Sequence, residues 1–143
     1  MQFLTLATLF AATAIASPLA ARSTELVSTS DAVIVRNSDE SVASISFTLS
    51  LDSTGETTGC TTGADANPDV NDPKFYYCDK KEYFFRYNEQ VGYARFKLAL
   101  VHQTSAFGGL QGNMTIGCNG PLPKVCSQVG KAEATLCSDD SCT

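Results

Sequence analysis

The chain has 143 residues, enough for one domain of common size, and a formal net charge of −5. This negative charge argues against binding to nucleic acid or to anionic membranes, because both need a basic surface. The chain has six cysteines but no Cys-x-x-Cys pair, and its single histidine, His102, has no cysteine close to it in sequence. We therefore expect disulfides formed in an oxidising compartment, with no metal and no cofactor.

The N-terminus has the pattern of a secretion signal. An apolar run that begins at Met1 ends in Ala14-Ile15-Ala16, a small-residue pattern that a signal peptidase can cleave. The run is shorter than the roughly 20 apolar residues that a membrane-spanning helix needs. We predict a signal peptide at 1–16, a short pro-segment at 17–22 that is removed after Arg22, and a single β domain at 23–143 that is secreted to the extracellular space and leaves the membrane.

Alternation of apolar and polar residues predicts an all-β domain. The clearest strand, at 45–51, places Phe47 and Leu49 on one face and Thr48 on the other. The same alternation predicts strands at 95–100 and 110–116, and shorter ones at 33–35, 74–78, 83–87 and 132–136. Residues 127–134 are compatible with a short helix as well as with a strand. Strands this short and regular predict a compact antiparallel β-sandwich or barrel, stapled by disulfides.

All six cysteines follow the predicted signal. Sequence alone leaves their pairing open, and pairing of neighbours is the simplest arrangement. It joins Cys60 to Cys78 around a long polar loop, Cys118 to Cys126 around a turn, and Cys137 to Cys142 at the end of the last strand. The last loop is short enough to strain the bond. The alternative is that Cys137 or Cys142 joins another chain.

Two segments carry a family resemblance. Residues 74–78 read Lys-Phe-Tyr-Tyr-Cys, and residues 125–136 contain the pattern Val-Cys-x-x-Val-x-x-Ala-x-x-Thr-Leu. With the order of four cysteines, Cys60, Cys78, Cys118 and Cys126, these segments resemble the Alternaria major-allergen family of secreted fungal proteins. The resemblance implies a β-barrel-like sandwich with intrachain disulfides Cys60–Cys78 and Cys118–Cys126, and no established enzymatic activity.

The resemblance also implies a function. Family members are allergens, elicitors of plant defence, and partners of plant pathogenesis-related proteins, so the expected role is that of an extracellular effector that binds a host plant protein. The family implies a small apolar ligand as well. The allergen has a cysteine that links two chains, whereas this sequence has none between Arg22 and Gly59. We therefore expect a monomer or a non-covalent homodimer.

We predict no catalytic residues. A serine or cysteine hydrolase would need His102 as its base, and the chain has no Gly-x-Ser-x-Gly motif. His102 continues the apolar face of the strand at 95–100, where a half-buried imidazole is the expected arrangement. The carboxylates of Asp39, Glu40, Asp69, Asp72, Asp139 and Asp140 fall in turn-like segments, and turn formation accounts for them. A small secreted hydrolase is therefore the least favoured function.

The segment at 74–97 interleaves aromatic and basic residues. Alternation favours one aromatic face in the core and basic residues on the wet face. If the chain recognises a protein, the exposed tyrosines and arginines of this segment are the expected anchors. The candidates are Tyr76, Tyr83, Arg86 and Tyr87. If the rings stack on sugars instead, the chain is a cell-wall carbohydrate-binding protein.

One modification motif is present. Asn113-Met114-Thr115 is an N-glycosylation sequon, and Asn113 falls on the polar face of its predicted strand. The sequence therefore permits a glycan at Asn113.

Overall fold

The computed structural model describes residues 23–119 and 122–142. The predicted signal peptide (1–16) and pro-segment (17–22) lie outside this part of the chain, so both stay predictions. The elements are β1 (Thr24–Thr29), β2 (Val33–Arg36), β3 (Val42–Leu51), β4 (Thr57–Thr61), β5 (Tyr76–Tyr77), β6 (Tyr83–Gln90), β7 (Arg95–Ser105), β8 (Gly108–Gly117), β9 (Val125–Ser127), β10 (Ala132–Cys137) and a 3-10 helix, η1 (Asp140–Cys142). Among the described residues, no helix has the length and apolar character needed to cross a bilayer.

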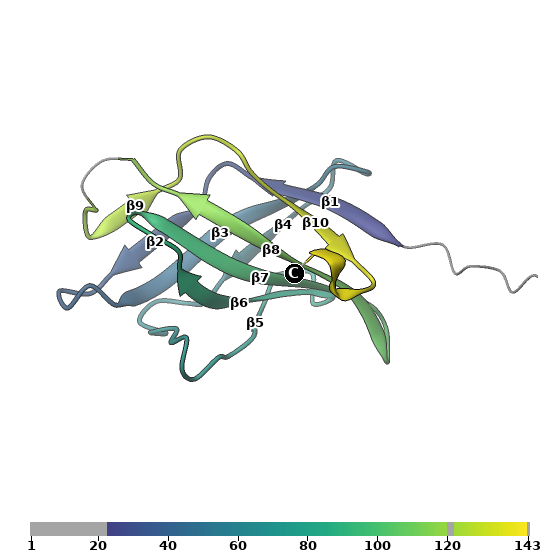
Figure 1. Ribbon diagram of the computed structural model, residues 1–143, viewed down its shortest axis with the longest axis horizontal. Coiled ribbons are helices and arrows are strands. Elements are labelled where there is room, and N and C mark those ends of the chain that lie inside the picture. Colours follow the sequence, from purple (N-terminus) through teal and green to yellow (C-terminus); the bar gives the residue numbers. More distant parts are fainter. Residues whose placement is uncertain (1–22, 120–121, 143) are drawn as a thin grey trace, which may run out of the picture.

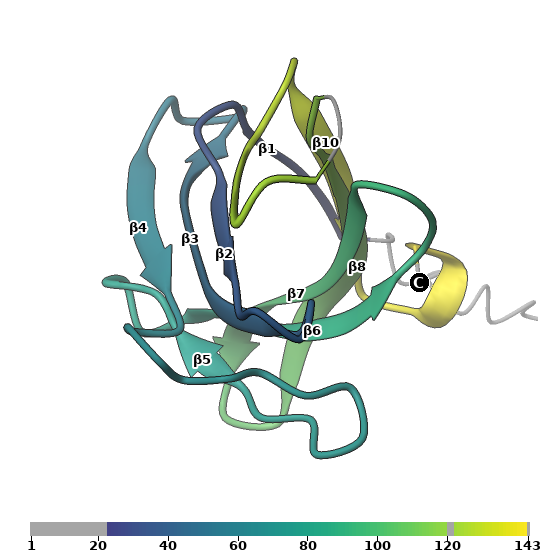
Figure 2. The same cartoon turned by 90° about the vertical axis from the view of Figure 1, so that its left-hand side faces the viewer.

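The strands pair antiparallel in one sheet that curls into a half-barrel (Figures 1 and 2). Their order is β5-β6-β7-β8-β10-β1-β3-β2-β9. Ser46 of β3 pairs with Val33 of β2 and with Thr61 of β4, so β4 lies on the opposite side of β3 from β2. An isolated bridge between Cys60 in β4 and Cys78, directly after β5, joins the β4 edge of the curled sheet to the β5 edge. The predicted all-β sandwich or barrel is thus confirmed.

Most of the predicted strands are present. Those at 33–35, 45–51, 83–87, 95–100, 110–116 and 132–136 lie within β2, β3, β6, β7, β8 and β10. The strand predicted at 74–78 is shorter and consists of Tyr76 and Tyr77. Residues 127–134 form no helix and instead contribute to β9 and β10. Strands β1, β4 and β9 were not predicted. Their segments are short or rich in threonine, and they offer few apolar residues from which to recognise an alternating face.

The core lies on the inner face of the curled sheet. Phe85, Phe96, Leu98, Met114 and Ile116 are completely buried. They come from the three long strands β6, β7 and β8, whose alternate residues point inward. The opposite wall contributes Phe47, whose ring meets that of Phe85 edge to face at 4.9 Å between centroids. Burial of each such side chain contributes roughly 1.5–3 kcal/mol to folding.

Three disulfides close three loops of the chain. They join Cys60 to Cys78, Cys118 to Cys126 and Cys137 to Cys142, which is the neighbour pairing expected from the sequence. The first bond lies at the bridge between β4 and the segment after β5. The third ties η1 to the end of β10. Because all six cysteines are paired within the chain, Cys137 and Cys142 do not link two chains in this structure.

The junction between β8 and β10 depends on a glycine. The two strands pair at a single position, Gln111 with Cys137. A Cβ atom at Gly112 would collide with the backbone oxygen of Thr135 in β10. Glycine at position 112 therefore allows the two backbones to approach each other where the sheet continues from β8 to β10.

Candidate functional site

Three aromatic side chains meet on the outer face of the sheet at β5 and β6. The ring of Phe84 lies 5.3 Å from that of Phe75 and 5.4 Å from that of Tyr77, centroid to centroid. Phe75 is 48% exposed and Tyr77 is 56% exposed. We call Phe75, Tyr77 and Phe84 the outer aromatic cluster. Clustered exposed rings are uncommon on a protein without partners and are typical of binding surfaces.

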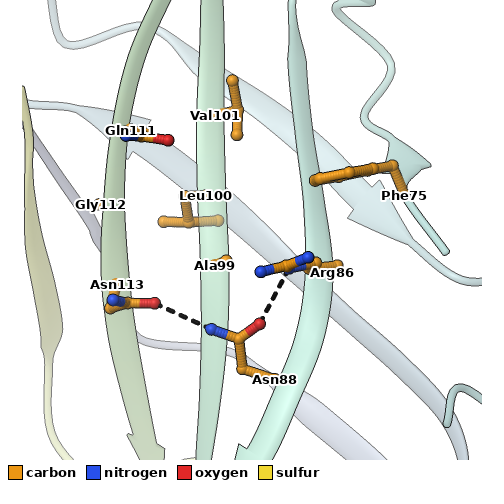
Figure 3. A pocket seen from close by; sticks show the side chains of 9 residues that line it. All are labelled: Phe75, Arg86, Asn88, Ala99, Leu100, Val101, Gln111, Gly112 and Asn113. Atoms are coloured by element: carbon orange, nitrogen blue, oxygen red, sulfur yellow. Dashed lines mark hydrogen bonds between the residues drawn. The ribbon is translucent and has the colours of Figure 1, made fainter. Parts of the chain in front are cut away.

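A groove of about 320 Å³ runs beside the cluster across the outer faces of β6, β7 and β8 (Figure 3). The Arg86 guanidinium lies over the ring of Phe75, 5.5 Å from its centroid. Arg86 Nε donates a hydrogen bond of 3.0 Å to Asn88 Oδ1, and Asn88 Nδ2 donates one of 3.1 Å to Asn113 Oδ1. Ala99, the cross-strand neighbour of both Arg86 and Asn113, contributes only a methyl group between them. The groove therefore combines a held cation, the three amides of Asn88, Gln111 and Asn113, and one aromatic wall.

The four predicted anchors lie in different environments. Arg86 faces the groove, and Tyr76 is half-buried, with its ring centroid 5.7 Å from that of Phe85. The prediction is wrong for Tyr83 and Tyr87, which are only 3% and 9% exposed. Both share the inner face of β6 with Phe85, because alternate residues of a strand point to the same side. Neither ring faces the outer aromatic cluster, although Tyr87 contributes to the wall of a second groove, beside Val42 and Pro68.

Phe75 and Tyr77 are exposed but are absent from the predicted anchors. The signal that identifies them is the register of the β5–β6 pair. Once Phe85 is assigned to the core, alternation places Phe84 outside, and the pairing of Tyr77 with Phe84 places Tyr77 on the same face. This pairing between two separate segments could not be read from the alternation within either one.

A second set of polar side chains lies on the inner face. The Tyr83 hydroxyl donates a hydrogen bond of 2.9 Å to Glu25 Oε1, and Glu25 Oε2 lies 2.7 Å from His102 Nδ1. The rings of Tyr83 and His102 stack at 4.1 Å between centroids. Burial, followed by the hydrogen bond to the Glu25 carboxylate, raises the pKa of the Tyr83 phenol far above its ordinary value. The set ties β1 to β6 and β7, strands with which β1 does not pair.

The His102 side chain is 21% exposed. The expected half-buried imidazole is therefore confirmed. Its stacking on Tyr83 and its contact with Glu25 account for its position without a substrate.

Two of the predicted turn carboxylates, Asp39 and Asp69, accept hydrogen bonds within turns. Asp39 Oδ1 accepts hydrogen bonds from Ser41, at 3.1 Å from the backbone nitrogen and 2.6 Å from the hydroxyl. These bonds lower the pKa of Asp39. Asp69 Oδ1 accepts a bond of 2.9 Å from the backbone nitrogen of Asn71. Asp39 and Asp69 also line the second groove, which has a volume of about 470 Å³.

The sequence profile of one protein family, Alternaria alternata allergen 1, matches residues 28–137. The chain belongs to the Alternaria alternata allergen 1 family. The comparison with curated proteins finds no match. Membership of the family confirms the resemblance noted from the sequence and supports an allergen-type secreted protein.

The part of the chain that matches the Alternaria alternata allergen 1 family contains the whole outer surface described above. The aromatic cluster, Arg86, Asn88 and Asn113 all lie within 28–137, as do the Cys60–Cys78 and Cys118–Cys126 disulfides. Glu25 and Cys142 lie outside the matched range. The hydrogen bonds of Glu25 and the third disulfide therefore each involve a residue beyond the family's matched segment.

Proposed function

We propose that this member of the Alternaria alternata allergen 1 family is a secreted fungal effector that binds a host plant protein and triggers or modulates defence. The proposed role is binding rather than catalysis. The observation that carries the proposal is the outer aromatic cluster beside Arg86, where two rings are about half exposed and a guanidinium is held over one of them. Aromatic residues and arginine are the side chains that most often dominate the energy of protein interfaces.

The charge of the surface indicates what kind of partner it fits. Arg86 presents a cation in a chain whose net charge is −5. Its Nε is bonded to Asn88, which fixes the plane of the guanidinium and lowers the entropy lost on binding. A partner should therefore offer a carboxylate for Arg86 and an apolar patch for Phe75 and Tyr77.

A disulfide supports the cluster. β5 has only two residues, and Tyr77 is followed directly by Cys78, which is bonded to Cys60 in β4. A strand of two residues has too few backbone hydrogen bonds to hold itself in place. The disulfide thus positions Tyr77 and the neighbouring Phe75, so reduction of this bond should weaken partner binding.

The test is a binding titration with purified plant pathogenesis-related proteins, the partners implied by the family. The mature, oxidised protein is compared with Phe75→Ser/Tyr77→Ser and with Arg86→Ala. Loss of hot-spot residues costs at least about 2 kcal/mol, so the affinity should fall by roughly 30-fold or more. Phe107→Ser is the matched control, because Phe107 is a fully exposed ring in the turn between β7 and β8.

The proposal fails if the cluster variants bind as tightly as the parent protein, or if Phe107→Ser is the variant that loses affinity. A second readout is infiltration of plant leaves. The parent protein and the Phe107→Ser variant should provoke a defence response, whereas the cluster variants should not. A correctly oxidised parent protein that is inactive across several hosts contradicts the proposal directly.

A carbohydrate-binding role is the second candidate, and the groove is the observation that favours it. An aromatic wall next to the amides of Asn88 and Asn113 is a combination that sugars bind, through stacking and hydrogen bonds. Pull-down on chitin, glucan and pectin separates the two functions. Binding to one of these polymers that is lost in Phe75→Ser supports the carbohydrate role, and absence of binding to all three removes it.

A further inference from the structure

The second groove lies between the turn that joins β2 to β3 and the long loop that joins β4 to β5. A hydrogen bond of 2.8 Å from Asn37 Nδ2 to Asn67 Oδ1 connects the turn to the loop. The backbone nitrogen of Asn67 donates a second bond, of 2.9 Å, to the backbone oxygen of Ala43 in β3. The Cys60–Cys78 disulfide closes the same loop. The two sides of the groove are therefore held to each other without a ligand.

Tyr87 offers this groove an unused hydroxyl group. The residue is buried and lines the groove. No described residue hydrogen-bonds its hydroxyl, yet none of the fully enclosed side-chain nitrogens and oxygens in the described ranges lacks a bond, so this hydroxyl reaches the surface. Burial raises the pKa of the Tyr87 phenol, which keeps it protonated at neutral pH. The groove thus contains a phenol that can exchange hydrogen bonds with a ligand.

The buried side of the second groove is apolar and its exposed rim is acidic. Val42 and Pro68 are buried beside Tyr87, whereas Asp39 and Asp69 are exposed. The bonds that the two carboxylates accept within their turns all go to Oδ1. The Oδ2 atom of each carboxylate can therefore accept a bond from a ligand.

The charges of the rim indicate the kind of ligand. Glu40, the third carboxylate of the groove, is paired with the Arg36 guanidinium, at 3.6 Å from Nη2. Two carboxylates remain without a cation among the described residues, Asp39 on the turn and Asp69 on the loop. A matching ligand has two positive charges joined by an apolar chain. A bare metal ion would leave the apolar side of the groove unused.

We propose that the second groove binds an aliphatic diamine, with its two ammonium groups at Asp39 and Asp69 and its hydrocarbon chain over Val42 and Pro68. The Tyr87 hydroxyl accepts a hydrogen bond from one of the ammonium groups. Bonds between ammonium and carboxylate groups are charge-assisted and stronger than bonds between neutral groups. The volume of about 470 Å³ lies within the range of about 300–1,000 Å³ for small-ligand sites.

The experiment is calorimetric titration of the oxidised protein with the diamine cadaverine, with pentylamine as the ligand that lacks one ammonium group. Tyr87→Phe removes only the hydroxyl and should weaken cadaverine binding by roughly tenfold, as loss of a hydrogen bond to a charged group does. Asp39→Asn and Asp69→Asn should each weaken it by about threefold, because exposed ion pairs contribute less. Asp72→Asn is the matched control, since Asp72 is an exposed carboxylate of the same loop that does not line the groove.

Cadaverine should bind several-fold more tightly than pentylamine, and Asp72→Asn should bind it as the parent protein does. Equal losses in Asp72→Asn and Asp69→Asn would show attraction by net charge alone and would overturn the inference. It also fails if the parent protein does not bind cadaverine, if Tyr87→Phe binds it unchanged, or if calcium ions or an acetylated lysine amide bind as tightly. No host protein enters these measurements and no residue of the outer aromatic cluster is changed, so this inference and the proposed partner binding can fail independently.

Discussion

Glu25 offers a sharp test of how the curled sheet is held together, because one carboxylate bonds to two side chains on strands that β1 does not contact through its backbone. Glu25→Ala removes the acceptor of the Tyr83 hydroxyl, on a residue that is only 3% exposed, and the partner of His102 Nδ1. A buried donor without its acceptor costs about 1–3 kcal/mol. Tyr83 should incur most of that cost, whereas His102, about one-fifth exposed, can partly rehydrate.

The expected total is a loss of about 3 kcal/mol in the free energy of unfolding. For a domain of this size, that loss corresponds to a fall of roughly 10 °C in Tm. Urea titration at pH 7, followed by tyrosine fluorescence, measures it, since the chain contains five tyrosines and no tryptophan. Glu25→Gln is the control: its amide oxygen still accepts from Tyr83, so this variant should lose less stability.

A double-mutant cycle with Tyr83→Phe isolates the Tyr83–Glu25 hydrogen bond. In the parent protein, Tyr83→Phe should cost about 1.5–3 kcal/mol, the usual range for a hydrogen bond to a charged group. In the Glu25→Ala background the hydroxyl has already lost its acceptor, so the same change should cost little. Equal costs in both backgrounds, or a loss below about 0.5 kcal/mol for Glu25→Ala, would refute this account.

Removing Cys60–Cys78, which spans 18 residues and joins two sheet edges, should lower the free energy of unfolding by about 3 kcal/mol. Removing Cys137–Cys142, which spans 5 residues, should lower it by about 2 kcal/mol. Denaturant titration of the paired Cys→Ala variants measures both losses, and the reverse order contradicts the prediction. Gly112→Ala should destabilise the fold by about 1–3 kcal/mol, because the added Cβ would collide with the backbone oxygen of Thr135. Gly117→Ala is the control in the same titration: its Cβ would meet nothing within 4 Å, so this variant should be nearly as stable as the parent protein. Burial and Glu25 raise the pKa of Tyr83 in the folded state. Above about pH 10 the unfolded chain therefore releases this proton first, and the stability of the folded state falls as pH rises. Thermal unfolding from pH 8 to pH 11 should show a shallower fall of Tm with pH in Tyr83→Phe than in the parent protein, and identical slopes would exclude this cause.

Much of the fold could be predicted from alternation alone, since Phe96, Leu98 and Leu100 are all buried as their spacing requires. Alternation could not find β1, β4 or β9, short strands whose conformation is decided by pairing with distant neighbours. These strands depend on tertiary contacts rather than on local pattern.

The candidate site, too, could be predicted from local sequence only in part. The aromatic and basic segment at 74–97 could be recognised as distinctive, but which of its rings face outward depends on the register between β5, β6 and β7. That register sends Tyr83 and Tyr87 inward and leaves Phe75 and Tyr77 outside. The partnership of Glu25 with Tyr83 and His102 joins residues 58 and 77 positions apart, which no local pattern reveals.

In the proposed function, the outer aromatic cluster and Arg86 form the surface that contacts a host protein. Hydrogen–deuterium exchange of the oxidised protein, with and without a bound pathogenesis-related protein, tests it most directly. Exchange at 75–77 and 84–88 should be slower in the complex. Protection confined to other segments, such as the turn around Phe107, would contradict it.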